Sequence, residues 1–213
     1  NSGTLSEEQD ECAATSDITL NAPPQLIIDS LIIDLKNCGY DISCQDGDDG
    51  VVIAYVTGGV SPYTYTWTNS SNEEIYSGND NTISNLSAGT YTLSVTDANT
   101  CSSLSNQSIQ LFDPPELTYQ VQAESYFGFG VTCAGAEDGL INTSVSGGCP
   151  PYTYLWSNGE VTEEVNDIGA GEYSVSITDA NGCNEIIDIN ISEPPLIEIS
   201  ETHSNYNGYG VSC

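Results

Sequence analysis

Apolar and polar residues alternate along several short segments of this chain. In residues 63–67, YTYTW, the three aromatic residues fall on one face and the two threonines on the other. Residues 90–96, TYTLSVT, alternate in the same way, with Tyr91, Leu93 and Val95 on the apolar face. A period of two is the pattern of a half-buried β-strand, and no segment shows a convincing helical period. The pattern therefore predicts an all-β protein.

Turn signals separate these segments. Residues 50–59, GVVIAYVTGG, and residues 139–148, GLINTSVSGG, each read as a strand closed by a Gly-Gly turn. The TDAN motifs place Asp97 and Asp179 in hairpin turns, where an aspartate side chain accepts hydrogen bonds from the turn backbone. Six or seven short strands within about 80–90 residues match the size of an immunoglobulin-like sandwich.

The sequence is also repetitive. Three motif pairs recur in the same order: GGVSPYTYTW with GGCPPYTYLW, LSAGTY with IGAGEY, and SVTDANTC with SITDANGC. They align Trp67 with Trp156 and Tyr91 with Tyr173, and the second copy is seven residues shorter between these positions. In an immunoglobulin-like sandwich they would be the buried tryptophan of strand C and the tyrosine of the E–F corner. We therefore expect all four side chains in the structural cores.

Pro-Pro pairs mark the boundaries between repeats, in APPQL, DPPEL and EPPLI. We expect immunoglobulin-like repeats at 23–112 and 113–192, the tail of a preceding repeat at 1–22 and the head of a following repeat at 193–213. Such a series predicts a piece of a longer, exported array. Proline restricts its own φ and disfavours helical backbone in the preceding residue, so the array should be elongated.

Charge and composition narrow the range of partners. The chain has 31 acidic residues against one Lys or Arg, Lys36, so nothing is available to neutralise nucleic-acid phosphates or anionic lipid. No apolar run is long enough for a membrane span, and we expect no membrane insertion. Eight cysteines and no methionine fit an oxidising location outside the cell. Zinc is not expected, because the chain has no CxxC pair.

Catalysis has little support in the sequence. A serine or cysteine nucleophile needs a base, and His203, the chain's one histidine, lies in the polar stretch ETHSNYNGYG. Carboxylate pairs are too frequent in so acidic a chain to indicate a glycosidase. We expect no enzyme activity.

Two acidic loops are candidate calcium sites. The loop QDGDDG offers Asp46, Asp48 and Asp49, and its counterpart GAEDG offers Glu137 and Asp138. Calcium takes six to eight oxygen ligands from carboxylates and backbone carbonyls on flexible loops. The alternative is that each Asp-Gly pair only turns strand A into strand B. Calcium is thus the one cofactor that the sequence raises.

The motif series as a whole resembles a known repeat. The order C-x4-DG, GG-x2-PYTY-x-W, AG-x-Y and TDAN-x-C is similar to the SprB-type repeat of cell-surface adhesins in gliding and other Bacteroidota. The resemblance covers essentially the whole chain. It implies an immunoglobulin-like fold, export to the cell surface, adhesion or filament formation linked to gliding motility, and no catalysis. This chain departs from the pattern at Cys38, at Cys149 and in the seven extra residues of its first repeat.

These observations predict a mechanical function. We expect a stalk or filament segment of a secreted adhesin, with neighbouring repeats of the same chain as its partners. One alternative is a calcium-dependent glycan-binding module that holds surface polysaccharides. Another is a self-assembling extracellular filament subunit that binds other copies of itself.

Six of the eight cysteines follow the repeat, in two classes of three. One class lies before strand B and the other after strand F. The members are Cys44, Cys133 and Cys213 in the first class, and Cys12, Cys101 and Cys183 in the second. Pairing one class with the other leaves three registers open: within a repeat, across the Pro-Pro linker, or forward to the far turn of the next repeat.

Standard immunoglobulin topology favours a forward staple. It places the A–B turn at the C-terminal end of a sandwich, and the B–C and F–G turns at the N-terminal end. A disulfide within one repeat would have to span the sandwich, whereas its Cα atoms must lie within about 7 Å. Head-to-tail stacking instead brings Cys38, near one A–B turn, to Cys149, in the next B–C turn. We predict a Cys38–Cys149 bond, with Cys44–Cys183 beside it slightly favoured over the other registers.

Overall fold

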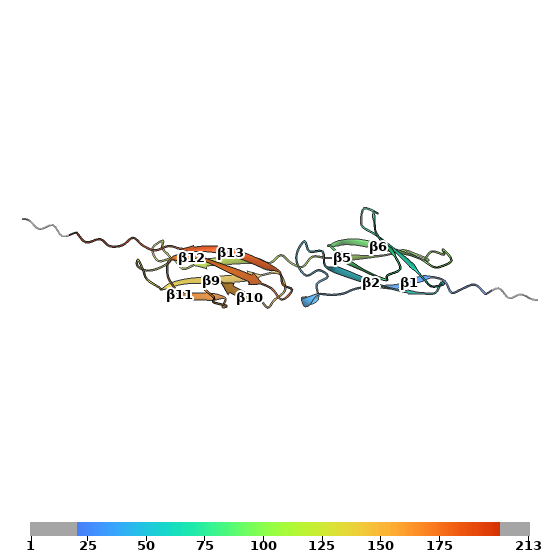
Figure 1. The fold of residues 1–213 in the computed structure, drawn as a ribbon, viewed down its shortest axis with the longest axis horizontal. Helices are drawn as coiled ribbons and strands as arrows, with labels where there is room; N and C mark the ends of the chain where they lie inside the picture. The colour runs from blue at the N-terminus through green and yellow to red at the C-terminus, as the bar shows by residue number, and fades with distance from the viewer. Residues whose placement is uncertain (1–20, 201–213) are drawn as a thin grey trace, which may run out of the picture.

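The computed structural model describes residues 21–200, which form two β-sandwiches placed end to end (Figure 1). The two units contain thirteen strands, and the one helical element in the described residues is a 3-10 turn, η1 (Asn37–Gly39). The all-β, tandem, immunoglobulin-like architecture expected from the sequence is confirmed. None of the helices in residues 21–200 has the length and hydropathy needed to cross a membrane.

The first sandwich contains seven antiparallel strands in two sheets. One sheet has the order β1-β2-β5 and the other the order β4-β3-β6-β7. The strands are β1 (Ile27–Ile33), β2 (Gly50–Thr57), β3 (Thr64–Thr68), β4 (Glu74–Gly78), β5 (Thr82–Leu86), β6 (Gly89–Thr96) and β7 (Gln107–Leu111).

The second sandwich repeats this plan with six strands. Its sheets have the orders β11-β9-β8 and β10-β12-β13. The strands are β8 (Thr118–Ala123), β9 (Gly139–Ser146), β10 (Thr153–Trp156), β11 (Glu164–Ile168), β12 (Gly171–Thr178) and β13 (Asn184–Ile191). The predicted boundary at 112/113 falls in the linker between β7 and β8.

Strand β4 accounts for the length difference between the repeats. It forms a hairpin with β3 and lies at the edge of its sheet. In the second sandwich β10 is followed directly by a tight turn, in which the Gly159 amide donates to the Trp156 carbonyl oxygen. The seven additional residues of the first repeat therefore build one edge strand and leave the rest of the sandwich unchanged.

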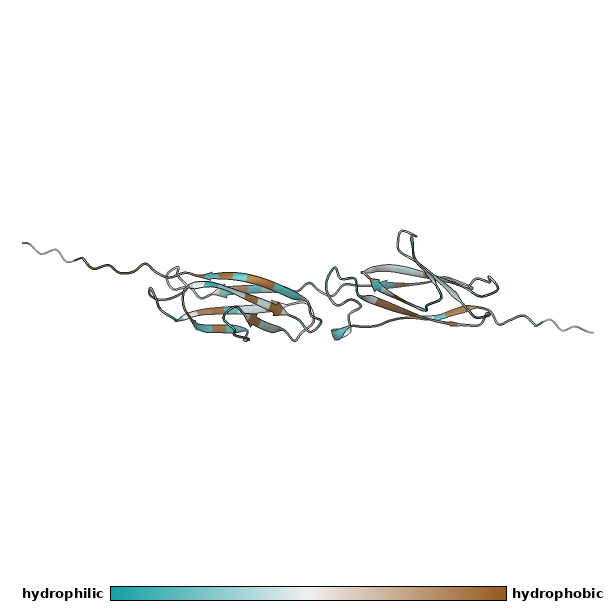
Figure 2. Cartoon of the chain, in the orientation of Figure 1, coloured by the Kyte–Doolittle hydropathy of each residue, from teal (hydrophilic) through white to brown (hydrophobic). Residues whose placement is uncertain are grey.

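Each sandwich has its own core, filled by the alternating apolar positions of its strands (Figure 2). Trp67 and Trp156 are among the largest buried side chains, at 0% and 2% exposure. Tyr91 is buried and Tyr173 is half-buried against the second core. The four aromatic residues expected in the cores thus occupy them.

Both tyrosines also close a corner of the chain. The Tyr91 hydroxyl donates to the Ser87 carbonyl oxygen at 2.9 Å, and the Tyr173 hydroxyl donates to the Gly169 carbonyl oxygen at 3.1 Å. Each bond spans the corner that leads into the long strand β6 or β12. This is the arrangement of the tyrosine corner in immunoglobulin-like domains.

Replacing Tyr91 with Phe should remove the corner hydrogen bond and keep the ring in the core. We expect the free energy of unfolding to fall by about 1 kcal/mol, the typical net contribution of such a bond. Urea denaturation measures the change. The matched control is Tyr55→Phe, because Tyr55 is 49% exposed. An equal loss in both variants would show that the corner bond has no special role.

Candidate functional site at the domain junction

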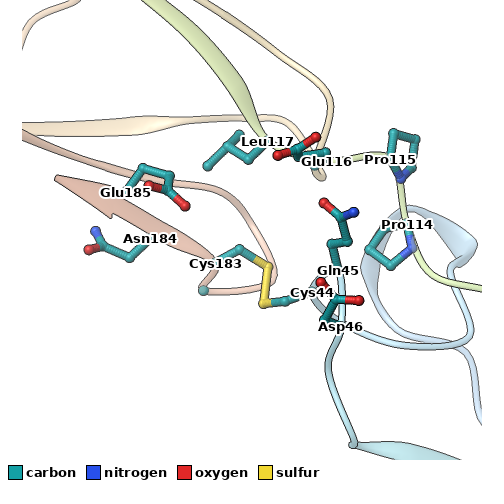
Figure 3. A pocket seen from close by; sticks show the side chains of 12 residues that line it. Cys44, Gln45, Asp46, Pro114, Pro115, Glu116, Leu117, Cys183, Asn184 and Glu185 are labelled. Carbon is teal, nitrogen blue, oxygen red and sulfur yellow. A yellow bond between two sulfur atoms is a disulfide. The ribbon is translucent and has the colours of Figure 1, made fainter. Parts of the chain in front are cut away.

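The two sandwiches meet through loops. The β1–β2 connection of the first unit, residues 34–49, faces the β9–β10 turn and the β12–β13 turn of the second. The linker, residues 112–117, runs beside them (Figure 3). Apolar packing stops at the boundary, since the buried clusters of the two units share no residue. Other interactions must therefore hold the units in line.

Two disulfides cross the junction. Cys38 bonds to Cys149, and Cys44 bonds to Cys183. The Cα atoms of the pairs lie 5.8 Å and 5.6 Å apart, within the range that a disulfide requires. Both pairs follow the forward register that the topology argument favours. Cys38 reaches its partner from the η1 turn, where its φ is 60°.

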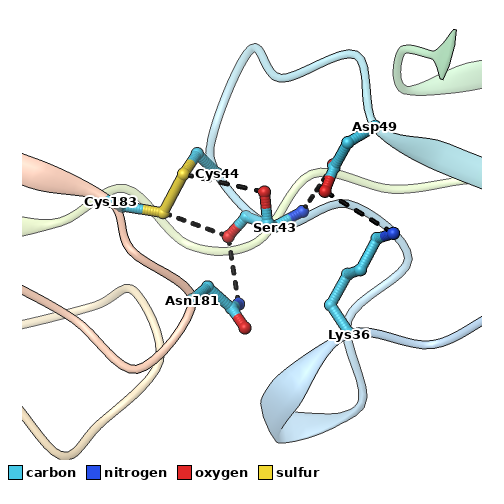
Figure 4. A network of polar contacts seen from close by, with 6 residues as sticks. All are labelled: Lys36, Ser43, Cys44, Asp49, Asn181 and Cys183. Atoms are coloured by element: carbon cyan, nitrogen blue, oxygen red, sulfur yellow. Dashed lines mark hydrogen bonds and ion pairs between the residues drawn. A yellow bond between two sulfur atoms is a disulfide. The ribbon is translucent and has the colours of Figure 1, made fainter.

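Hydrogen bonds between the units flank the disulfides. The side-chain amide of Asn181 donates to the Ser43 carbonyl oxygen at 3.0 Å, directly beside the Cys44–Cys183 bond (Figure 4). The side-chain amide of Asn37 donates to the Ala180 carbonyl oxygen at 2.8 Å. Both bonds involve the β12–β13 turn, so that turn is the main contact surface of the second unit.

One buried carboxylate orients both cysteines of the second unit. Asp179 is 5% exposed, and its Oδ1 atom accepts hydrogen bonds from the backbone amides of Asn181 and Cys183, each at 2.9 Å. Its Oδ2 atom accepts from the backbone amide of Cys149 at 2.8 Å. Asp179 therefore joins the two turns that carry the cysteines. The sequence indicates its role in the hairpin turn but gives no sign of the bond to Cys149.

Asp97 makes the same bonds in the first unit, although Cys101 has no disulfide partner within residues 21–200. It accepts from the amides of Asn99 and Cys101 at 2.9 Å and from the amide of Val60 at 3.0 Å. The Cys101 amide, with those of Val60 and Asn99, holds the pKa of Asp97 below its usual value. The paired turns are thus present in both described units, whether or not the cysteines in them are bonded within residues 21–200.

A second aspartate shapes the long β1–β2 connection. Asp49 accepts from the Ser43 amide at 2.9 Å and lies 3.5 Å from the Lys36 ammonium (Figure 4). Burial alone would raise the pKa of Asp49, but the Ser43 hydrogen bonds and the Lys36 charge outweigh it and lower that pKa. Lys36, the one Lys or Arg of the chain, therefore forms its ion pair within this connection.

Asp138 occupies the equivalent place in the second unit. Its carboxylate accepts from the hydroxyl and the amide of Thr132, which lower its pKa. Asp49 and Asp138 thus act as loop-closing residues in both units. Asp46, Asp48 and Glu137 are exposed. Within residues 21–200 no group of three or more acidic, cysteine or histidine side chains is arranged to hold a metal ion.

A groove of about 440 Å³ lies between the units (Figure 3). Its walls come from the Cys44–Cys183 bond, the β1–β2 connection and the linker prolines Pro114 and Pro115. Acidic side chains from both units line it: Asp46, Glu116 and Glu185. No basic side chain is among its lining residues, so like charges face one another across this part of the junction.

The linker is tied to the unit that follows it. The Gly148 amide donates to the Pro115 carbonyl oxygen at 2.9 Å, and the Gly59 amide donates to the Pro24 carbonyl oxygen at 2.7 Å. A side chain at Gly147 would collide with the Glu116 carbonyl oxygen, and φ at this residue is +78°. The Gly-Gly turns are therefore needed because the linker backbone passes directly against them.

The remaining predicted features lie outside the described residues. They are Cys12, Cys213 and His203, together with most of the predicted tail at 1–22 and head at 193–213.

Comparison with known proteins agrees with the repeat pattern. The family model of the SprB repeat matches residues 40–72 and 131–161, which contain the Asp-Gly turn, the Gly-Gly turn and the PYTY-x-W strand of each unit. Each sandwich therefore contains one segment that matches the SprB repeat. The match supports a repeat domain of the surface-adhesin type. A search of curated proteins finds no match.

Several solved structures resemble the two SprB repeats at low sequence identity. Three N-terminal domains of the Hoc capsid protein of bacteriophage RB49 align with a TM-score of 0.45 and 18% identity, over 79% of this chain and 59% of that one. Eight N-terminal immunoglobulin domains of the Down syndrome cell adhesion molecule align with a TM-score of 0.38 and 16% identity, over 81% of this chain and 25% of that one. Fibronectin(III)-like modules of Clostridium thermocellum CbhA align with a TM-score of 0.32 and 14% identity, over 82% of this chain and 100% of that one. The chain spans less than two thirds of the length of the first two of these structures.

Calcium binding by the first SprB repeat stays a prediction. If Asp46, Asp48 and Asp49 bind the ion, calorimetric titration should give heat that Asp48→Asn reduces, and calcium should raise the melting temperature by mass action. Magnesium is the control, because a chain with a net charge of −30 attracts any divalent cation diffusely. Equal stabilisation by both ions would contradict a specific site.

Asp179→Ala should impair formation of the junction disulfides, because it frees both cysteine-bearing turns of the second SprB repeat. After refolding from the reduced state in glutathione buffer, peptide mapping should recover less of both disulfides than in the wild type. Asp97→Ala is the matched control, since it removes the same turn bonds from the first repeat, which contributes its other end to this junction. Equal yields in the two variants would show that Asp179 does not position the cysteines.

Proposed function

We propose that this chain is a stiff stalk segment of a secreted, repetitive cell-surface adhesin and that it spaces a binding region away from the cell. The observation that carries the proposal is the double disulfide across the junction. SprB repeats and immunoglobulin-like sandwiches serve mainly as structural modules, in keeping with a mechanical function. The link to gliding motility stays a prediction.

Three covalent connections cross the junction. They are the linker and the two disulfides, which leave the first unit at Cys38 and Cys44 and enter the second in two different turns. A single linker would allow bending and twisting, since one connection leaves rotation free. Additional connections at separate points oppose both motions. The pair of units should therefore behave as one rod.

The positions of the cysteines also determine how tension passes through the rod. Cys44 follows β1, the first strand of the first unit, and Cys183 directly precedes β13, the last strand of the second. A force applied to the two ends can pass along β1, through the Cys44–Cys183 bond and along β13. The residues enclosed by that bond are outside this path. Their unfolding therefore cannot lengthen the chain while the disulfide is intact.

Force spectroscopy with the chain held by its ends tests this mechanism. The oxidised chain should not release the segment between Cys44 and Cys183, whose sequence separation is 139. A variant with all four junction cysteines replaced by serine should release them, adding roughly 460–500 Å at 3.3–3.6 Å per residue.

Two partial variants provide the controls. Cys38→Ser with Cys149→Ser should remain as inextensible as the wild type. Cys44→Ser with Cys183→Ser should still protect the segment between Cys38 and Cys149, a sequence separation of 111, from extension. Full extension of the oxidised wild-type chain would contradict the stalk mechanism.

A further inference from the structure

The outer ends of the two described units carry unpaired counterparts of the junction cysteines. Cys101 occupies the position of Cys183, in the β6–β7 turn, and Cys133 occupies the position of Cys44, in the β8–β9 connection. Both are exposed and make no disulfide within the described residues. The equivalent residues bond to each other at the inner junction, so the same chemistry is already present once in this structure.

Each outer end also has the backbone geometry of the bonded end. Asp97 holds the Cys101 turn with the bonds that Asp179 makes around Cys183. Asp138 holds the amide of Thr132, just before Cys133, as Asp49 holds the amide of Ser43. The two half-sites are therefore formed before any partner is present.

The second disulfide has an apolar replacement at the outer ends. Phe127 stands at the position of Cys38, and the two residues share a left-handed backbone, with φ of 53° and 60°. Val60 stands at the position of Cys149. Phe127 is 105% exposed and Val60 is 37% exposed. Left-handed backbone is unfavourable for a bulky residue. The phenyl ring of Phe127 gains no packing on its own domain in return, because it is fully exposed.

The groove of the inner junction is present at the outer ends as two separate halves. One, of about 150 Å³, is lined by Pro23, Pro24, Gly59 and Cys101. The other, of about 270 Å³, is lined by Cys133, Pro194, Pro195 and Ile197. The complete groove, of about 440 Å³, combines the equivalents of both sets around a single linker.

The linker also indicates which unit completes each half. Residues 193–200 continue from the second unit, and Ile197 and Ile199 are 91% and 86% exposed. Their equivalents Leu26 and Ile28 are each 3% exposed in the first sandwich. Residues 193–200 therefore have the apolar pattern of a first strand whose sandwich lies further along the chain. A unit from a separate chain would bring a second linker into a groove that holds one.

We propose that Cys133 forms a disulfide with the F–G-turn cysteine of the SprB-type unit that follows in the same polypeptide, and that Cys101 forms one with the A–B-loop cysteine of the unit that precedes. Phe127 and Val60 supply apolar contacts in place of the second disulfide. The inference rests on the proposed stalk function and names its partner. When each bond forms, two thiols lose two protons and two electrons. A small disulfide such as oxidised glutathione accepts them and is reduced to two thiols.

An extended chain tests the proposal. In this chain, residues 1–193 are followed by a second copy of residues 23–112. The copy carries Cys38→Ser and Cys44→Ser. The design places Cys133 opposite the Cys101 and Val60 of the copy. After oxidation in glutathione buffer, non-reducing peptide mapping should join Cys133 to the Cys101 of the copy. Iodoacetamide should then label Cys133 at least tenfold more slowly than in the 213-residue chain.

Matched variants test the apolar contact. Phe127→Ser in the extended chain should slow formation of the new disulfide several-fold. Leu155→Ser, which removes another exposed apolar side chain far from the junction, should leave the rate unchanged. If the added copy fails to fold, a second design appends residues 134–192 after Cys213, with the Cys149 of that copy changed to Val. In that design Cys133 should bond to the Cys183 of the copy.

Several outcomes would overturn the inference. In either folded design, a freely alkylated Cys133, or a bond from Cys133 to another cysteine, would contradict it. Dimers of the unextended chain joined from Cys133 to Cys101 would assign the site to a second copy instead. Each of these results is distinct from failure of the stalk function, which the force measurement on the inner junction tests separately.

Discussion

Two cysteines can bond only when their Cα atoms lie within about 7 Å, and this chain meets that limit twice across a domain boundary. The distance depends on turns that are fixed before the domains meet. Asp179 holds two turns of the second unit together, and Asp49 shapes the loop of the first. The disulfides therefore depend on two buried or half-buried carboxylates and on the linker that brings the units together.

Covalent bonds suit this junction because noncovalent attraction between the two units is weak. Each apolar core ends within its own unit, so hydrophobic burial contributes little between them. The net charge is −30, and acidic side chains from both units line the groove. At physiological ionic strength salt screens such repulsion over about 8 Å, so charges that share one narrow groove still repel each other. A disulfide is insensitive to salt and keeps like-charged domains in contact.

Much of this arrangement could be predicted from the sequence, because strand alternation, turn residues and repeat spacing are local signals. The tandem sandwiches and the positions of Trp67 and Trp156 follow from them. Predicting the Cys38–Cys149 pair also needed the topology of the fold, since the sequence separation of the two cysteines is 111. The bond from Asp179 to the Cys149 amide could not be predicted, because it depends on how two turns of one sandwich pack. The seven extra residues gave no sign that they would form strand β4.

The order of the elements gives the junction its mechanical meaning. In an antiparallel sheet the hydrogen bonds lie perpendicular to the strands, so the bonds to β2 and β12 hold β1 and β13 extended while the tension passes along these two strands. Strand β1 pairs with β2 over six residue pairs, and β13 pairs with β12 over eight. Cys44 and Cys183 connect the inner ends of the same two terminal strands. The elements that receive the force are thus the best-paired strands at each end, and the cores behind them need not unfold to transmit it.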